Sequence, residues 1–309
     1  MSAIVTRELG KVYRAVGRTQ MRALEAVDLN VREGEVYGFL GRNGAGKTTT
    51  IKILCSLLRP TSGEAFVLGE NARTRKARGL IGYLPEQPYF YEYLTPRETI
   101  DFYARLQGLD AAARAREWEK LAGMLDLRGI ADQRVKGFSK GMRQRLGFAV
   151  ALVGDPPILI LDEPMSGLDP LGRRSIRELI LWMRDAKKTL FFSSHVLGDV
   201  EQICDRVGIL VRGRLTHEGR LDELLGEQVK QVEIIVAGLS PEAARPLAAR
   251  AVSHRTLDEL DAFLVDGQDA ANDLVRAVHG AGGRLVEFSP VRKSLEDYFI
   301  EAQEKDKAS

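Results

Sequence analysis

The sequence predicts an α/β core that carries an inserted helical subdomain and is followed by a small α+β domain. The apolar segments Glu35–Gly41, Ile158–Leu161 and Thr189–Phe192 have the length of strands that are buried on both faces. Helical spacing follows the first segment at Lys47–Leu58 and separates the other two at Arg173–Arg184. Because strands that are linked by helices pair in parallel, these segments predict one parallel sheet.

A helical region lies between the first and second of these strands, from Thr95 to Ala151. Thr95 is a capping residue, Pro96 suits the first helical position, and Glu98 completes a capping box. A later apolar face at helical spacing consists of Trp118, Leu121, Met124 and Leu125. We therefore place a helical subdomain at about residues 88–156, inside a first domain that covers residues 1–226.

The sequence beyond the core predicts a hairpin and then a second domain. Val207–Leu215 contains Arg212-Gly213 at its centre, which indicates a hairpin turn, and Leu221–Leu225 has helical spacing. We assign residues 227–309 to a small α+β domain. Its predicted elements are a strand at Val232–Val236, a helix opening with Ser240-Pro241, a strand at Phe263–Val265, a helix around Ala270–Val278, a strand at Arg284–Phe288 and a last helix capped by Ser294.

Composition argues against several classes of protein. The chain has 309 residues, and its 45 basic and 43 acidic residues give a net charge of +2, which offers no argument for binding nucleic acid. Cys55 and Cys204 are too few for a disulfide framework or a zinc site, and their apolar neighbours predict buried, reduced thiols. The sequence shows neither an apolar stretch long enough to span a bilayer nor a signal peptide. We expect a cytoplasmic protein whose membrane part, where it has one, is supplied by a partner.

The segment from Gly41 to Thr49 carries the strongest chemical signal. It fits the pattern G-x-x-x-x-G-K-[ST] and lies between a predicted strand and a predicted helix. Backbone N–H groups of such a loop surround phosphates, Lys47 neutralises the terminal phosphates, and the Thr48 hydroxyl ligates Mg²⁺. An ordinary glycine-rich turn, the alternative, would need neither the lysine nor the threonine. We predict that ATP is bound by Gly41, Arg42, Asn43, Gly44, Ala45, Gly46, Lys47, Thr48 and Thr49, with Lys47 also taking part in catalysis.

The strand Ile158–Leu161 ends in two acids, Asp162 and Glu163. In α/β proteins, ligand groups lie at the carboxyl ends of the strands. Asp162 is the predicted Mg²⁺ residue, acting through water, and Glu163 is the predicted catalytic base that takes the proton of the attacking water. The alternative is two solvated acids at a strand end, and the presence of a phosphate loop in the same chain makes this alternative weaker.

Two short motifs resemble those of a known family. The segment Ser139–Gln144, SKGMRQ, resembles the signature motif of ABC ATPases, and Ser166–Asp169, SGLD, resembles their D-loop. Over roughly residues 3–225, the chain resembles the nucleotide-binding subunit of an ABC transporter. The resemblance implies a P-loop (RecA-like) nucleotide hydrolase core with an N-terminal antiparallel β subdomain. It also implies a homodimer in which Ser139 and Gly141 of one subunit bind the ATP that the other subunit holds.

Further residue roles follow from the resemblance. His195, which comes after the strand Thr189–Ser194, matches the switch histidine, a catalytic residue that contacts the γ-phosphate. The alternative is a structural role, which is the usual one for a lone histidine at a strand end. Tyr13 matches the aromatic residue that stacks on adenine, although a tyrosine is also ordinary in a strand.

The sequence departs from the family pattern in the signature and in the Q-loop. The signature commonly reads SGGQ, so Lys140 and Met142 are departures. The glutamine that usually follows the strand Ile81–Leu84 and its proline is replaced by Glu86, with Gln87 one place later. Both residues are candidate Mg²⁺ ligands. A carboxylate at this place would attract the metal ion but repel the triphosphate.

The second domain shows a weaker resemblance to known proteins. Its ending, Ser294–Phe299, is similar to that of ATPase subunits of ABC-2-type exporters. This implies an Mg-dependent ATPase that powers export through a separate integral membrane permease, with ATP closing the dimer and hydrolysis reopening it. Such a protein is peripheral on the inner face of the cell membrane and is bound there through its partner. An aromatic run that either grips the partner or anchors its own loop consists of Tyr89, Phe90, Tyr91 and Tyr93.

Three alternatives stay open at this point. The chain could be a soluble ABC protein that acts on ribosomes or nucleic acid, although it has a single phosphate loop and no sustained heptads. It could be the ATPase of an importer. The second domain could also be a regulatory sensor.

Overall fold

The computed structural model describes residues 1–14, 20–225, 231–257, 259–291, 295–298 and 300. The chain divides into two units, Met1–Leu221 and Asp222–Glu301. A helix with the length and hydropathy of a bilayer span does not occur in the part of the chain that the structure describes.

The N-terminal residues form an antiparallel sheet, as the family resemblance implies. Its strand order is β2-β1-β4-β5. In β2, the buried residues Val27, Leu29 and Val31 alternate with exposed ones, which is the pattern of a strand with one face on the core. The bounds of the strands are Ser2–Tyr13 for β1, Met21–Arg32 for β2, Ser62–Val67 for β4 and Glu70–Asn71 for β5.

A second sheet holds the strands that the sequence predicts, with the order β10-β9-β3-β8-β7-β6. Neighbours from β9 to β6 pair in parallel, and β10 pairs with β9 in an antiparallel hairpin that turns at Arg212-Gly213, as predicted. Every residue of β3, β7 and β8 is buried. The bounds are Val36–Leu40 for β3, Ile81–Leu84 for β6, Ile158–Asp162 for β7, Thr189–Ser194 for β8, Arg206–Val211 for β9 and Arg214–Arg220 for β10.

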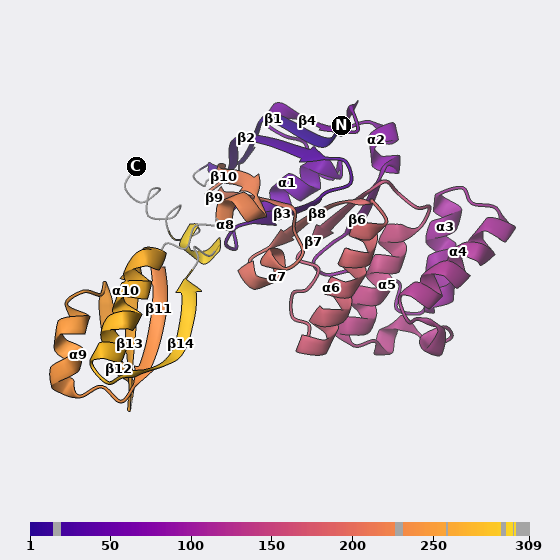
Figure 1. Ribbon diagram of the computed structural model, residues 1–309. Helices are drawn as coiled ribbons and strands as arrows, with labels where there is room; N and C mark the ends of the chain where they lie inside the picture. The colour runs from indigo at the N-terminus through magenta and orange to yellow at the C-terminus, as the bar shows by residue number, and fades with distance from the viewer. Residues whose placement is uncertain (15–19, 226–230, 258, 292–294, 299, 301–309) are drawn as a thin grey trace. The chain divides into compact units, whose positions relative to one another are not determined.

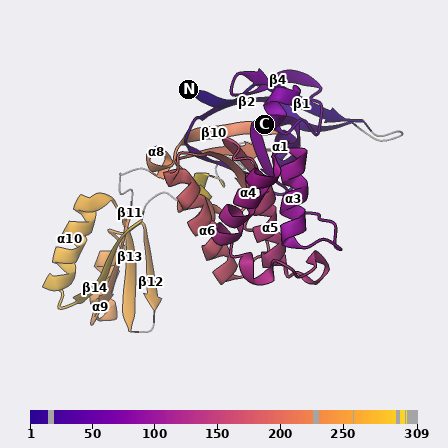
Figure 2. The same cartoon turned by 90° about the vertical axis from the view of Figure 1, so that its right-hand side faces the viewer.

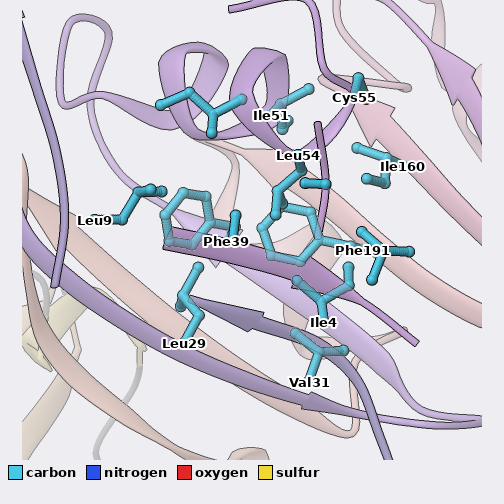
Figure 3. Close-up of a cluster of buried hydrophobic side chains, with 14 of the residues drawn as sticks. Ile4, Leu9, Leu29, Val31, Phe39, Ile51, Leu54, Cys55, Ile160 and Phe191 are labelled. Atoms are coloured by element: carbon cyan, nitrogen blue, oxygen red, sulfur yellow. The ribbon is translucent and has the colours of Figure 1, made fainter. Parts of the chain in front are cut away.

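Helix α1 (Lys47–Leu54) packs with both sheets in one core. Figure 3 shows its apolar side chains beside Phe39 of β3 and Phe191 of β8, with residues of β1 and β2 among them. The prediction that this helix continues to Leu58 is wrong. Ser56 adopts a left-handed φ of 60°, and the N–H groups of Leu57 and Leu58 both bond the carbonyl of Lys52, which closes the helix.

The helical subdomain contains α3 (Pro96–Leu106), α4 (Ala111–Met124) and α5 (Lys140–Leu152), with the 3-10 turns Arg128–Ile130 and Val135–Gly137 between the last two helices (Figure 1). The predicted capping box is present, with Thr95 and Glu98 bonding each other's backbone N–H groups. On α4, Trp118 and Leu121 are buried as expected. Outside this subdomain, the first unit also contains α2 (Arg75–Gly79), α6 (Pro170–Asp185) and α7 (Leu197–Glu201). Helix α8 (Leu221–Leu225) begins at the last residue of the first unit.

The second unit has a β-α-β-β-α-β order and the strand order β12-β13-β11-β14, which is the ferredoxin-like arrangement. Helices α9 and α10 pack on one face of the sheet (Figure 2). Ile234 of β11 pairs with Phe263 of β13, and both side chains are buried in the core of this unit. The bounds are Gln231–Ala237 for β11, Pro241–Ala248 for α9, Ser253–Leu257 for β12, Leu260–Asp266 for β13, Gly267–Gly280 for α10 and Arg284–Val291 for β14.

Most of the predicted elements of this unit are present, and Ser240 caps α9 as expected. Strand β12 was not predicted. Ser294, the predicted cap of the last helix, lies outside the described residues. Leu295 in the same segment is buried.

Candidate nucleotide-binding site

The carboxyl ends of β3, β7 and β8 lie at one edge of the second sheet, because these strands are parallel neighbours. The chain continues from them into the loop that begins at Gly41, into Glu163 and into His195. Residues that are far apart in the sequence are therefore brought together, at the edge where α/β proteins bind ligands.

The loop from Gly41 to Thr49 leads directly into α1. Gly46 is the N-cap of α1 and has a left-handed φ of 113°, and a Cβ added to it would lie 2.5 Å from the carbonyl oxygen of Ala23. Only glycine fits both restrictions. Within the described part of the chain, no side chain caps this helix, so the N–H groups of its first turn remain available for an anion.

Lys47 is buried and reaches back across the loop. Its Nζ donates to the carbonyl oxygen of Gly41 at 2.6 Å and lies 3.2 Å from Oε1 of Glu163. Among the described residues, Oε1 nevertheless accepts no hydrogen bond of good geometry. The Lys47 ammonium thus stands between the phosphate loop and the acid at the end of β7, where it can neutralise phosphate.

Thr48 and Asp162 form the oxygen-rich part of the site. The Thr48 hydroxyl lies 3.4 Å from Oδ1 of Asp162, and the Ser193 hydroxyl donates to the same Oδ1 at 2.7 Å. Mg²⁺ prefers oxygen ligands and keeps several waters, so it needs only one or two protein groups beside phosphates. This donor set fits Mg²⁺. Burial, and then the charge of Asp162, raise the pKa of the nearby Tyr83 phenol, which therefore stays neutral.

Glu163 is held in place from two sides. His195 Nδ1 donates to its Oε2 at 2.8 Å, and its own backbone N–H donates to the Ser193 hydroxyl at 2.9 Å. Its φ of 49° is left-handed, a conformation that costs energy for a residue with a side chain. A buried carboxylate with a fixed direction, beside a lysine and a histidine, is suited to accept a proton.

A cavity of about 480 Å³ opens in front of these groups. Glu86 lines it, whereas Gln87 is exposed and does not. Tyr13 stands beside the loop, with its hydroxyl 3.4 Å from that of Thr49, and pairs with the cavity residue Met21 across β1 and β2. The predicted residues that line the cavity are Arg42, Asn43, Gly44, Gly46, Lys47, Thr48, Thr49, Glu86, Glu163 and His195, while the buried Gly41, Ala45 and Asp162 do not line it.

Ser139 and Gly141 do not join this cavity. They line a different one of about 400 Å³, together with Leu168 and Asp169. The Ser139 side chain caps α5 by accepting from the N–H of Met142. The signature motif and the phosphate loop therefore face separate hollows within one chain.

The sequence did not reveal the contacts by which two residues, Ser193 and Gln144, shape the site. Ser193 joins Asp162 to the backbone of Glu163. The buried Gln144 donates to the carbonyl oxygen of Pro164 at 2.7 Å and so ties α5 to the turn after β7. Ser193 lies on a predicted strand, two places before His195, and this position was the sequence signal that could have identified it as a site residue.

The cysteines behave as predicted. Cys55 and Cys204 are both buried and free. Burial raises the pKa of each thiol, so both remain protonated at neutral pH.

Comparison with known proteins agrees with this geometry. Residues 24–166 match the family described as ABC transporter. An uncharacterised ABC transporter ATP-binding protein of Synechocystis is 40% identical over 97% of this chain and 84% of its own length. The bacitracin transport ATP-binding protein BcrA of Bacillus licheniformis is 41% identical over 75% of each chain. The daunorubicin/doxorubicin resistance ATP-binding protein DrrA of Streptomyces peucetius is 38% identical over 80% of this chain and 75% of its own.

A solved structure shows the same fold. The dimeric, post-hydrolysis ATP-binding cassette MJ0796, bound to ADP and Pi, superimposes with a TM-score of 0.66 and 25% identity. The match covers 71% of this chain and 99% of that one. With its phosphate loop, its acids at the end of β7 and these relatives, the chain belongs to the ABC transporter family of ATP-binding, ATP-hydrolysing proteins.

Proposed function

We propose that this chain powers an exporter as one of two identical ATPase subunits beneath a separate membrane-spanning permease. The observation that carries the dimer is the separation of the two cavities. Ser139 and Gly141 line one, and the phosphate loop with Glu163 lines the other. A second copy would bring its signature motif to the nucleotide that the first copy holds.

In the proposed reaction, the loop from Gly41 to Thr49 binds the phosphates of ATP. Lys47 exchanges its contact with Glu163 for phosphate oxygens, which frees Oε1 of Glu163 to accept a proton. A water attacks the γ-phosphorus, its proton passes to Glu163, and the bond to the bridging oxygen of ADP breaks. His195 holds Glu163 in position through Oε2.

Mg²⁺ would be held by Thr48 directly and by Asp162 through water, and it would neutralise charge on the phosphates. Ser193 keeps the Asp162 carboxylate turned toward Thr48 through its hydrogen bond. Tyr13, beside Thr49, is the proposed platform for adenine. Glu86 is the better placed of the two Q-loop candidates, because it lines the cavity.

The aromatic loop after β6 is the proposed contact with the permease. Phe90 is buried and anchors the loop, whereas Tyr89 is 82% exposed and Tyr93 is 64% exposed. Tyr91 packs on Tyr93 and on Phe102 of α3, at centroid distances of 5.7 and 5.8 Å. Exposed aromatic side chains on an ordered loop suit the core of a protein interface. Through this contact the protein would sit on the inner, cytoplasmic face of the membrane.

Export is supported by the names of BcrA and DrrA, which describe drug transport and drug resistance. The test is affinity purification of the tagged chain from detergent-solubilised membranes. We expect an integral membrane protein to co-purify, and the triple variant Tyr89→Ser, Tyr91→Ser, Tyr93→Ser to lose it while still binding ATP. Trp182→Ser, which removes a half-exposed aromatic residue from α6, is the matched control. Recovery of ribosomes or DNA in place of a membrane protein would overturn the proposal.

A further inference from the structure

Two of the three departures from the family pattern, Glu86 and Lys140, carry opposite charges. Glu86 stands where glutamine is usual, and Lys140 stands in the signature where glycine is usual. Both side chains are exposed, and neither makes an ion pair or a hydrogen bond with the residues that the structure describes. Each side chain is therefore available to pair with an opposite charge on a second copy of the chain, or with a ligand, that covers the surface around it.

Glu86 lies on the nucleotide side. It lines the same cavity as Lys47, Glu163 and His195. A carboxylate in this cavity repels the triphosphate, and the repulsion grows as water is excluded. A cation that arrives when the cavity closes would offset this cost.

Lys140 lies on the signature side. It is the first residue of α5, between Ser139 and Gly141, which line the other cavity. Its ammonium lies across the D-loop, because a Cβ added to Gly167 would collide with its Nζ. Lys140 thus occupies the surface where the signature motif and the D-loop meet.

We propose that Glu86 of one subunit and Lys140 of its partner form an ion pair when two copies close over ATP. The inference rests on the proposed dimer, in which the partner's Ser139 and Gly141 cover the cavity that Glu86 lines. The partner's Lys140 lies between these two residues in the sequence, and its long, flexible side chain can reach the rim of this cavity. The pair would form only in the closed dimer, so it would favour closure and relieve the repulsion between Glu86 and ATP.

The test mixes two charge reversals. The Glu86→Lys chain keeps Lys140, and the Lys140→Glu chain keeps Glu86, so each variant alone forms dimers with like charges at both sites. A mixed dimer has one native pair and one reversed pair. All chains carry Glu163→Gln, and the dissociation constant of the dimer with ATP and Mg²⁺ is measured by analytical ultracentrifugation. Circular dichroism and ATP binding by each monomer check that the variants fold.

We expect each variant alone to dimerise at least about tenfold more weakly than the parent, since close charge pairs couple this strongly. The mixture should return to within about threefold of the parent. Glu64→Lys mixed with Lys136→Glu, exposed residues of the same charges, should show no such recovery. As a second measurement, Lys140→Ala should weaken the dimer less when Glu86 is already Gln.

The possible outcomes distinguish the proposed ATP-bound dimer from the proposed ion pair. A parent that dimerises with ATP, together with a mixture no tighter than the separate variants, would overturn the ion pair and leave the dimer standing. If Lys140→Ala weakens the dimer equally whether residue 86 is Glu or Gln, Lys140 contacts the nucleotide and does not pair with Glu86. A parent that fails to dimerise would overturn both the proposed function and this inference.

Discussion

Nδ1 of His195 lies 2.8 Å from Oε2 of Glu163. An ionised carboxylate only accepts hydrogen bonds, so the proton of this contact belongs to His195. The bond fixes the direction of the carboxylate, while its other oxygen faces Lys47 at 3.2 Å. The histidine therefore positions the acid, whereas its contact with the γ-phosphate, which the family resemblance implies, stays a prediction.

Glu163→Gln should bind ATP but lose at least about 100-fold in turnover, because the amide cannot take the proton of the attacking water. The closed dimer should accumulate with ATP. Steady-state phosphate release and size-exclusion chromatography measure the two effects. Glu64→Gln, a change at an exposed position of β4, is the control and should leave both unchanged. Normal turnover in Glu163→Gln would remove this residue from its proposed role.

His195→Ala should lower kcat by about tenfold or more and change KM for ATP much less, because the ring positions Glu163 during the chemical step. His195→Asn retains a donor and should recover part of the loss. His279→Ala, at an exposed position of α10, is the matched control. A rise in KM with kcat unchanged would show that His195 serves nucleotide binding alone.

Lys47→Met should weaken ATP binding and also lower the free energy of unfolding of the first unit, by about 2 kcal/mol, because a buried carboxylate loses its cation. Adding Glu163→Gln removes the unpaired charge and should return most of this stability. Urea unfolding of the single and double variants measures the effect. Strictly additive losses would show that the 3.2 Å contact does not stabilise the fold.

The sequence was informative wherever one local pattern decides the structure. The strands β3, β7 and β8 are continuous apolar runs, and the capping box of Thr95 and Glu98 lies within one turn of helix. β12, by contrast, reads Ser-His-Arg-Thr-Leu and lies at the edge of its sheet with most residues exposed. An exposed edge strand needs no apolar alternation, so it leaves no signal to find.

The sequence predicts those residues of the candidate site that belong to short sequence motifs. The phosphate loop and the acids of β7 are short segments whose neighbours in the chain are also their neighbours in space. Ser193 is different, because it acts on residues 30 and 31 places away through strand pairing between β7 and β8. Which of Glu86 and Gln87 lines the cavity likewise depends on the path of the backbone, which no local pattern indicates.

Ser193→Ala should lower both stability and turnover. It removes the acceptor for the N–H of Glu163 and the donor to Asp162, both buried, at a cost of about 1–3 kcal/mol. Because Glu163 then loses a restraint on its left-handed backbone, kcat should fall more than the affinity for ATP. Thr6→Ala is the matched control, since the buried Thr6 hydroxyl also donates once and accepts once, between β1 and β2. It should destabilise the protein to a similar extent and leave kcat unchanged. Equal effects of the two substitutions on kcat would mean that Ser193 supports the fold and does not position the acid.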